Sequence, residues 1–427
     1  MSLRVLRPLG AVDISHIKHY LLYMAGRSLP KFLERTSPPH VGTLILLSGL
    51  SALSMNIFLP SLPKMAEHFQ ADYSLMQLSV ALYLGVNGIL QIVIGPISDN
   101  LGRRPVILWG TGIFLLATIG CIYAPNAGVF LACRMVQSGI AVAMVLSRAA
   151  VRDMYPQDKA ASMIGYVTMG MAVVPMIGPG IGGVLDEAFG WQANFWTLAI
   201  LGAAVMALTW ADFGETAVTR GQSLAAQFRQ YPELLTSPRF WGYSLACALS
   251  SGSFFAYLGG APYVGTEVYG LNPRALGLYF GAPAFGYFLG NYLTGRFAVR
   301  FGINAMVLWG CLILCLGLLA SIAIMLAGFG TAETFFGFMC FVGLGNGLTI
   351  PNATAGALSV RPHLAGTASG LAGAIMLGGG AALSAFAGFM LTPGSGPMPL
   401  LWIMIATSLL GAACAVFVIR RERRLGL

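Results

Sequence analysis

One arginine lies inside an apolar stretch, where its charge demands an explanation. Arg134 lies near the start of the apolar run at 128–148. If this run is a membrane helix, inserting the charged side chain of Arg134 near the bilayer centre costs roughly 2.5–3.5 kcal/mol of free energy. The side chain therefore needs a polar cavity or polar partners, and it would then be a candidate for binding a solute. The alternative is that it extends outward to the membrane surface.

A glycine-bounded turn joins two other apolar runs. Residues 95–105 read GPISDNLGRRP. Gly95 and Gly102 permit close backbone approach and unusual dihedral angles. Asp99 can interact with a helix N-terminus, where the helix dipole favours an anion. The sequence predicts a compact charged turn at the membrane surface, and an ordinary turn without further function is the alternative.

A second glycine-rich motif resembles a nucleotide-binding loop but has the wrong surroundings for one. Residues 178–183 read GPGIGG, which fits the pattern GxGxxG. No strand precedes the motif, it lies in a long apolar run, and no acid follows at the required spacing. Pro175 and Pro179 instead predict a kinked helix, and Gly178, Gly182 and Gly183 would admit a neighbouring helix.

The composition requires these residues to be positioned by membrane helices. Hydrophobic residues make up 57% of the chain and charged residues 9%, with a mean hydropathy of +0.76. Soluble domains carry roughly 25% charged residues. Apolar runs of about 20 residues recur, the length that a helix needs to cross a bilayer. The seven cysteines lie in or beside these runs, which indicates apolar packing without a disulfide framework.

Twelve membrane helices follow from this pattern. The predicted spans are 41–60, 74–97, 105–123, 128–148, 161–185, 192–212, 240–262, 273–295, 304–327, 333–355, 364–390 and 399–419. With the N-terminus inside, the outside loops contain only Lys64 and Arg274 among the basic residues, which predicts that both termini are cytoplasmic. This topology also explains the net charge of +9 better than nucleic-acid binding does.

The chain contains an internal repeat with a shift of 200 residues. Gly95 corresponds to Gly295, Gly102 to Gly302, and the sequence LWG at 108–110 to LWG at 308–310. The sequence thus predicts an all-α membrane protein of two parallel six-helix repeats. The predicted parts are a basic cytoplasmic tail at 1–40, a first half at 41–213, a cytoplasmic linker at 214–239, a second half at 240–419 and a basic tail at 420–427.

These motifs together resemble the major facilitator superfamily. The turn at 95–105 is similar to the hallmark loop of the superfamily, and Arg134 is similar to the arginine of its second motif, which faces the central cavity. Residues 175–183 resemble the motif of drug:proton antiporters, with Val174 in place of one glycine. The segments FLPSLP at 58–63 and RAAVRDMY at 148–155 resemble the Bcr/CflA group of bacterial drug-resistance exporters.

The resemblance implies a bacterial inner-membrane exporter of small drugs or metabolites that works by alternating access in exchange for protons. It needs no cofactor or metal, and a monomer is expected. The conformational gating residues would be Gly95, Asp99, Gly102, Arg103, Arg104, Arg152 and Asp153. The antiporter motif would be Pro175, Gly178, Pro179, Gly182 and Gly183. The substrate cavity would be formed by Asn56, Tyr83, Asn87, Gln91, Arg134, Gln137, Tyr257, Tyr287 and Asn291.

Asn56 stands where the group usually has an aspartate that can carry a proton. Asparagine does not titrate, and no acid lies deep within the predicted spans. Proton coupling would then use an acid at the membrane surface, for which Asp99 and Glu267 are the candidates. The alternatives are an uncoupled or differently coupled facilitator and, outside transport, a membrane enzyme or receptor. One arginine without a carboxylate predicts neutral, zwitterionic or weakly anionic substrates.

Overall fold

The described part of the chain folds into two groups of helices. The computed structural model describes residues 32–155, 163, 167, 174, 177–217, 229, 231–361, 364–392 and 394–426. The first bundle contains α2 (Val41–Asn56), η1 (Leu59–Ser61), α3 (Leu62–His68), α4 (Tyr73–Leu101), α5 (Arg103–Ile122), α6 (Ala127–Gln137), η2 (Ser138–Ile140), α7 (Ala141–Met154), a helical segment at 177–189 and α9 (Gln192–Asp212). The second contains α11 (Tyr231–Leu235), α12 (Pro238–Tyr263), the π-turn η3 (Val264–Val268), α13 (Pro273–Tyr279), α14 (Gly281–Phe301), α15 (Ile303–Leu326), α16 (Ala332–Ser359), α17 (Ala365–Met390) and α18 (Met398–Leu425).

The helices have the length and composition of membrane spans. In the residues that the structure describes, nine helical segments are long and apolar enough to cross a membrane. Two further segments are as long as these nine. One is α12, with 26 residues, and the other is formed by α13 and α14 taken together, because α14 follows α13 almost directly. The helical segment at 177–189 overlaps the end of the predicted fifth span, 161–185. Together these segments are consistent with twelve crossings. The last helix extends to Leu425, so most of 420–427 continues α18, whereas 1–31 lies outside the described residues.

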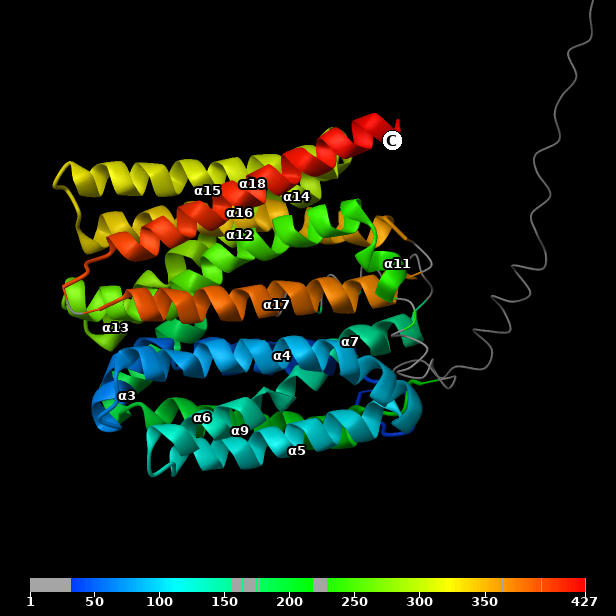
Figure 1. The fold of residues 1–427 in the computed structure, drawn as a ribbon. Helices are drawn as coiled ribbons and strands as arrows, with labels where there is room; N and C mark the ends of the chain where they lie inside the picture. The colour runs from blue at the N-terminus through cyan, green and yellow to red at the C-terminus, as the bar shows by residue number, and fades with distance from the viewer. Residues whose placement is uncertain are drawn as a thin grey trace, which may run out of the picture.

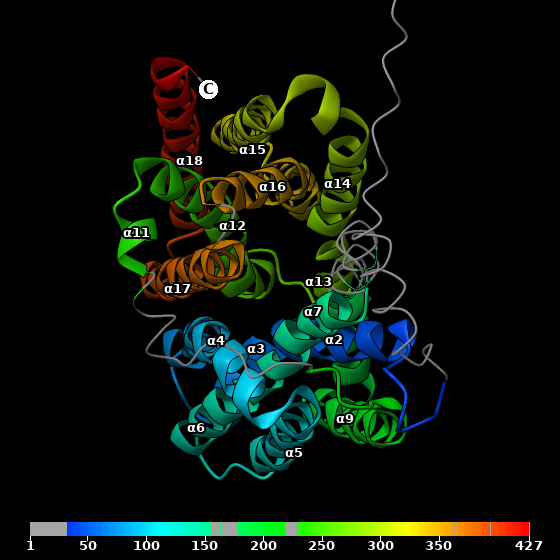
Figure 2. The same ribbon diagram turned by 90° about the vertical axis from the view of Figure 1, so that its right-hand side faces the viewer.

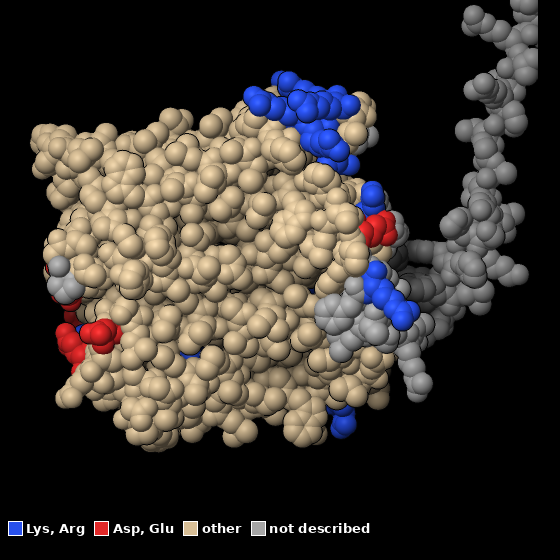
Figure 3. Space-filling model, viewed as in Figure 1, with Lys and Arg blue, Asp and Glu red and all other residues tan. Residues whose placement is uncertain are grey.

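The two bundles lie side by side with their helices running in the same general direction (Figures 1 and 2). The longest contact between them joins α4 to α17. Basic side chains gather at the end of the molecule that holds the C-terminus, which we call the basic end (Figure 3). Acidic side chains predominate at the opposite end, the acidic end (Figure 3), where α3 lies (Figure 1). Glu67 of α3 lines a pocket there together with Asp72 and Glu267.

Helices begin where the sequence supplies a cap. Asn126 Oδ1 accepts a hydrogen bond from the Val129 amide (2.9 Å), and Asn272 Oδ1 accepts one from the Ala275 amide (2.8 Å). These bonds satisfy N–H groups that lack a partner in the first turn of a helix. Proline occupies the first position of α12 and of α13, where its missing N–H costs no helix hydrogen bond.

The repeat in the sequence has a structural counterpart. Gly102 ends α4 with a φ of 95°, and Gly302 ends α14 with a φ of 81°. This left-handed conformation favours glycine at both turns. A methyl group on Gly110 would overlap Val142 of α7, and one on Gly310 would overlap Thr349 of α16. Glycine thus allows corresponding helices to pack closely in both bundles.

In each bundle an acid near the end of the last helix holds the start of the first long helix, α2 or α12. The Asp212 carboxylate of α9 accepts hydrogen bonds from the His40 amide (2.9 Å) and from Thr43 Oγ1 (2.6 Å). The Glu422 carboxylate of α18 pairs with Arg239 and accepts a hydrogen bond from the Tyr243 hydroxyl (3.0 Å). These contacts join α9 to the start of α2 and α18 to the start of α12 at the basic end.

Candidate functional site

The side chain of Arg134 is completely buried within the first bundle. Its exposed fraction is 0%, so it does not extend to the surface. The guanidinium carbon lies 4.4 Å from the ring centroid of Phe58 and 4.3 Å from that of Tyr83. Cations are attracted to the faces of aromatic rings at such distances. Phe58, which lies between α2 and η1, and Tyr83 of α4 therefore form an aromatic clamp around the positive charge that α6 carries.

The Arg134 guanidinium retains unused hydrogen-bonding capacity. One N–H donates to Gln137 Oε1, and Gln137 Nε2 donates to Thr118 Oγ1 (2.7 Å). Nε and Nη2 of Arg134 are buried and have no hydrogen-bond partner. In the part of the chain that the structure describes, no carboxylate forms an ion pair with this arginine. Because buried polar groups without a partner are costly, a hydrogen-bond acceptor placed at these two nitrogens would stabilise the guanidinium.

The structure brings three of the predicted cavity residues of the first bundle together: Tyr83, Arg134 and Gln137. Asn56 is also fully buried; its Nδ2 donates to the Ala52 carbonyl (3.0 Å), and its Oδ1 has no partner. Asn87 and Gln91 share one face of α4, with Gln91 Nε2 lying 3.5 Å from Asn87 Oδ1. The Gln91 side chain lies against Gly373 of α17, at the contact between the bundles.

The predicted cavity residues of the second bundle have different surroundings. Tyr257 is buried among aromatic rings, with centroids 5.2 Å from Phe280 and 6.3 Å from Phe336, and its hydroxyl has no hydrogen-bond partner. Asn291 Nδ2 donates to the Tyr287 carbonyl (2.8 Å) within α14. The described contacts do not connect these three residues with the Arg134 clamp.

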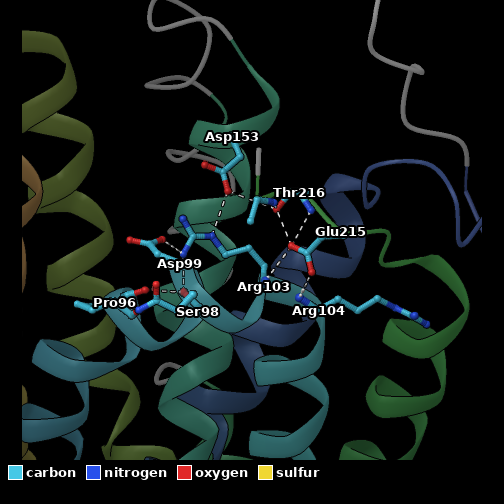
Figure 4. A network of polar contacts seen from close by, with 11 residues as sticks. Pro96, Ser98, Asp99, Arg103, Arg104, Asp153, Glu215 and Thr216 are labelled. Atoms are coloured by element: carbon cyan, nitrogen blue, oxygen red, sulfur yellow. Dashed lines mark hydrogen bonds and ion pairs between the residues drawn. The ribbon is translucent and has the colours of Figure 1, made fainter. Parts of the chain in front are cut away.

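The turn between α4 and α5 is the centre of a network at the basic end (Figure 4). Arg103 forms ion pairs with Asp99 and with Asp153, the latter at 3.1 Å, and also contacts Ser98 Oγ. These contacts tie the ends of α4 and α7 to the start of α5. Arg152 is exposed and lies beside Gly366 at the start of α17, in the other bundle.

Glu215 completes this network, although sequence reasoning did not single it out. Its carboxylate accepts hydrogen bonds from the backbone amides of Arg103 (2.8 Å) and Arg104 (3.2 Å). It therefore caps the N-terminus of α5, where the helix dipole favours an anion. Thr216 Oγ1 lies 3.4 Å from Asp153 Oδ2. The segment that follows α9 is thereby attached to the predicted gating turn.

Acids at the opposite end have two kinds of environment. Glu267 is exposed and lines a pocket of about 310 Å³ together with Glu67 and Asp72. Asp186, just beyond the predicted fifth span, is buried, and Lys64 Nζ lies 3.6 Å from its carboxylate. Burial raises the pKa of Asp186, and the positive charge of Lys64 opposes this shift.

The predicted antiporter motif lies where the two bundles meet at the acidic end. A methyl group on Gly183 would overlap the Pro273 carbonyl at the start of α13, and one on Gly277 would overlap the Pro179 carbonyl. Gly182 contacts the first bundle itself, at the Ile57 carbonyl. Gly178 lies beside Leu53 and Asn56. Pro175 lies outside the described residues.

Known proteins resemble the chain over most of its length. The sequence model of the Major Facilitator Superfamily matches residues 44–385. The chloramphenicol resistance protein of Pseudomonas aeruginosa is 32% identical over 352 residues, covering 79% of this chain and 82% of that protein. Multidrug resistance protein D of Escherichia coli (strain K12) is 29% identical over 369 residues, covering 85% and 91%. The bicyclomycin resistance protein homologue of Haemophilus influenzae is 27% identical over 360 residues, covering 83% and 90%.

The fold also resembles a solved structure. A bacterial homologue of the human lysosomal transporter Spinster, in an inward-facing and occupied conformation, superposes with a TM-score of 0.69. The sequences are 20% identical, and the match covers 89% of this chain and 96% of that one. At this identity the likeness concerns the fold alone.

Proposed function

The chain belongs to the major facilitator superfamily, and from this membership we propose that it is a secondary active transporter that exports small drug-like or metabolite solutes by alternating access. Relatives named for resistance to chloramphenicol and bicyclomycin support export of small neutral drugs. The observation that carries the proposal is the buried Arg134, which lies between aromatic rings and has two guanidinium nitrogens without a hydrogen-bond partner.

The Arg134 clamp supports a substrate that bears hydrogen-bond acceptors and no positive charge. A planar guanidinium offers donors in a fixed geometry, and hydrogen bonds to charged groups contribute roughly 1.5–3 kcal/mol. An organic cation would be repelled by a buried positive charge without a neighbouring carboxylate. We therefore propose neutral, zwitterionic or weakly anionic substrates.

We propose that the protein lies in the bacterial inner membrane with its basic end in the cytoplasm, and we retain the expectation from the sequence that both termini are cytoplasmic. Support comes from the concentration of Lys and Arg at one end of the molecule, since positively charged loops stay on the cytoplasmic side. The functional units in this proposal are the halves at 41–213 and 240–419, joined by the linker at 214–239. A monomer suffices for this arrangement.

Protons are the coupling ion that we propose, with an acid at the membrane surface as the carrier. Asp99 is already paired with Arg103, and Glu267 lies in an exposed acidic pocket. Asp186 is a third candidate, because its burial favours the protonated form while Lys64 favours the ionised one. An uncoupled or differently coupled facilitator is the second candidate function, and the non-titrating Asn56 favours it.

The test is drug transport in vesicles that contain the purified protein, with and without an imposed pH gradient. Gradient-driven accumulation of an amphenicol by the wild type would support proton exchange, and Asp186→Asn, Asp99→Asn and Glu267→Gln would then be compared. If the wild type only equilibrates the drug and Asn56→Asp gains gradient-driven accumulation, the protein is a facilitator. Lack of any drug movement with a folded protein would contradict the transport proposal for this substrate class.

Arg103→Gln should lower the transport rate at least about tenfold, because it removes both ion pairs that join α4, α5 and α7. Arg104→Gln is the matched control. It removes the same charge from the neighbouring residue, whose side chain donates to the Trp210 carbonyl (2.8 Å) and not to Asp99 or Asp153. Both variants keep the backbone amides that Glu215 caps. Equal transport by the two variants would show that the ion pairs do not contribute to gating.

A further inference from the structure

An apolar groove lies on the outside of the second bundle, between α14 and α15. Its volume is about 470 Å³, and every lining residue is apolar. Both helices pack against α16 and make few contacts with each other, so α16 forms the floor of the groove (Figure 2). Phe301, Trp309 and Leu312 line it and are 43%, 42% and 44% exposed.

Two arginines stand beside the end of this groove. Arg296 and Arg300 lie on the last two turns of α14, and both are exposed. The Arg300 guanidinium carbon lies 5.3 Å from the ring centroid of Phe301, which itself lines the groove. Among the described residues, neither arginine forms an ion pair.

The corresponding turn of the first bundle neutralises its own charge. There Arg103 pairs with Asp99 and Asp153. With the 200-residue shift, Val299 replaces Asp99 and is 98% exposed. Segment 295–302 reads GRFAVRFG and contains two arginines and no acid. One of the two related turns therefore keeps an uncompensated positive charge next to an apolar groove.

We propose that this groove binds one anionic phospholipid of the cytoplasmic leaflet. The phosphate would contact Arg296 and Arg300, and an acyl chain would occupy the groove along Phe301, Trp309 and Leu312. Arginine presents donors that match the geometry of phosphate. Apolar side chains alone would accept the tail of any lipid, whereas the two charges select an anionic headgroup. The placement in the cytoplasmic leaflet rests on the orientation proposed above, and the binding itself does not.

Quenching of Trp309 fluorescence tests this proposal without measuring transport. The full chain is reconstituted in vesicles with acyl-brominated phosphatidylglycerol or with equally brominated phosphatidylcholine, and Trp309→Phe identifies the contribution of this residue. We expect phosphatidylglycerol to quench Trp309 preferentially. The preference is the apparent affinity of the groove for phosphatidylglycerol divided by that for phosphatidylcholine. In Arg296→Gln/Arg300→Gln this ratio should fall by about thirtyfold at low salt, or about fivefold per arginine.

Two further variants separate the groove from general surface charge. Arg296→Lys/Arg300→Lys keeps the charge and should retain most of the preference. Arg423→Gln/Arg424→Gln removes two exposed charges from α18 at the same end of the molecule and should retain all of it. Equal quenching by both lipids in the wild type would overturn the proposal, as would equal loss in the α14 and α18 variants. If neither lipid quenches Trp309, another protein segment or a second copy covers the groove, and the proposal fails.

Discussion

Arg134→Gln should lower transport of a neutral amphenicol at least about tenfold. The loss of one hydrogen bond from a charged donor removes roughly 1.5–3 kcal/mol, and about 1.4 kcal/mol corresponds to a factor of ten. The protein should remain folded, because the substitution removes a buried charge without leaving a charged partner behind, unlike the breaking of a buried ion pair. Drug flux and thermal unfolding are to be measured on the same purified preparation.

Arg421→Gln is the control for this substitution, since it removes an exposed arginine at the basic end. Its flux should equal that of the wild type. If the charge of Arg134 excludes cations, Arg134→Gln should also change selectivity. The ratio of the transport rate of an ethidium-like cation to that of the neutral drug should be higher in the variant than in the wild type. Wild-type protein that carries the cation and the neutral drug at equal rates would contradict the role given to Arg134.

The helical architecture could be predicted because a bilayer leaves few alternatives. Backbone groups in lipid must satisfy their own hydrogen bonds, so each apolar run predicts a helix, and α9 has the predicted bounds of 192–212. The glycine turn was predictable for a related reason. Gly102 and Gly302 recur at the same place in each repeat, and both adopt a positive φ.

The contacts of the candidate site were less accessible to sequence reasoning, because they join residues that are far apart in the chain. The sequence predicts a polar cavity or polar partners for Arg134, but not its contacts with the rings of Phe58 and Tyr83, which depend on how the segment between α2 and η1 lies against α4 and α6. Glu215 lies more than one hundred positions from the amides that it caps. Its place directly after α9 was the available signal, because that helix ends at the same membrane surface as the gating turn.

Gly182→Ala and Gly183→Ala should damage the protein in different ways although the residues are adjacent. A methyl group on Gly182 would overlap the Ile57 carbonyl within the first bundle, and backbone atoms cannot rotate aside. Overpacking of this kind costs about 1–3 kcal/mol. The free energy of unfolding should fall by that amount, which a lower thermal unfolding midpoint in detergent would report.

Gly183 instead faces Pro273 of the second bundle, so its added methyl group would penalise only the arrangement in which the bundles meet at the acidic end. The same 1–3 kcal/mol would then reduce the population of that arrangement by about 5- to 150-fold, without a comparable loss of bundle stability. Spin labels at Glu187 and Val268, in a chain whose native cysteines are replaced, would measure the separation at this end. We expect a longer distance between the two labels in Gly183→Ala and an unchanged distance in Gly182→Ala. That result would show that Gly183 influences the conformational equilibrium between the bundles, whereas Gly182 serves helix packing within the first bundle. An unchanged separation in Gly183→Ala, or equal destabilisation by both variants, would mean that the motif only packs helices.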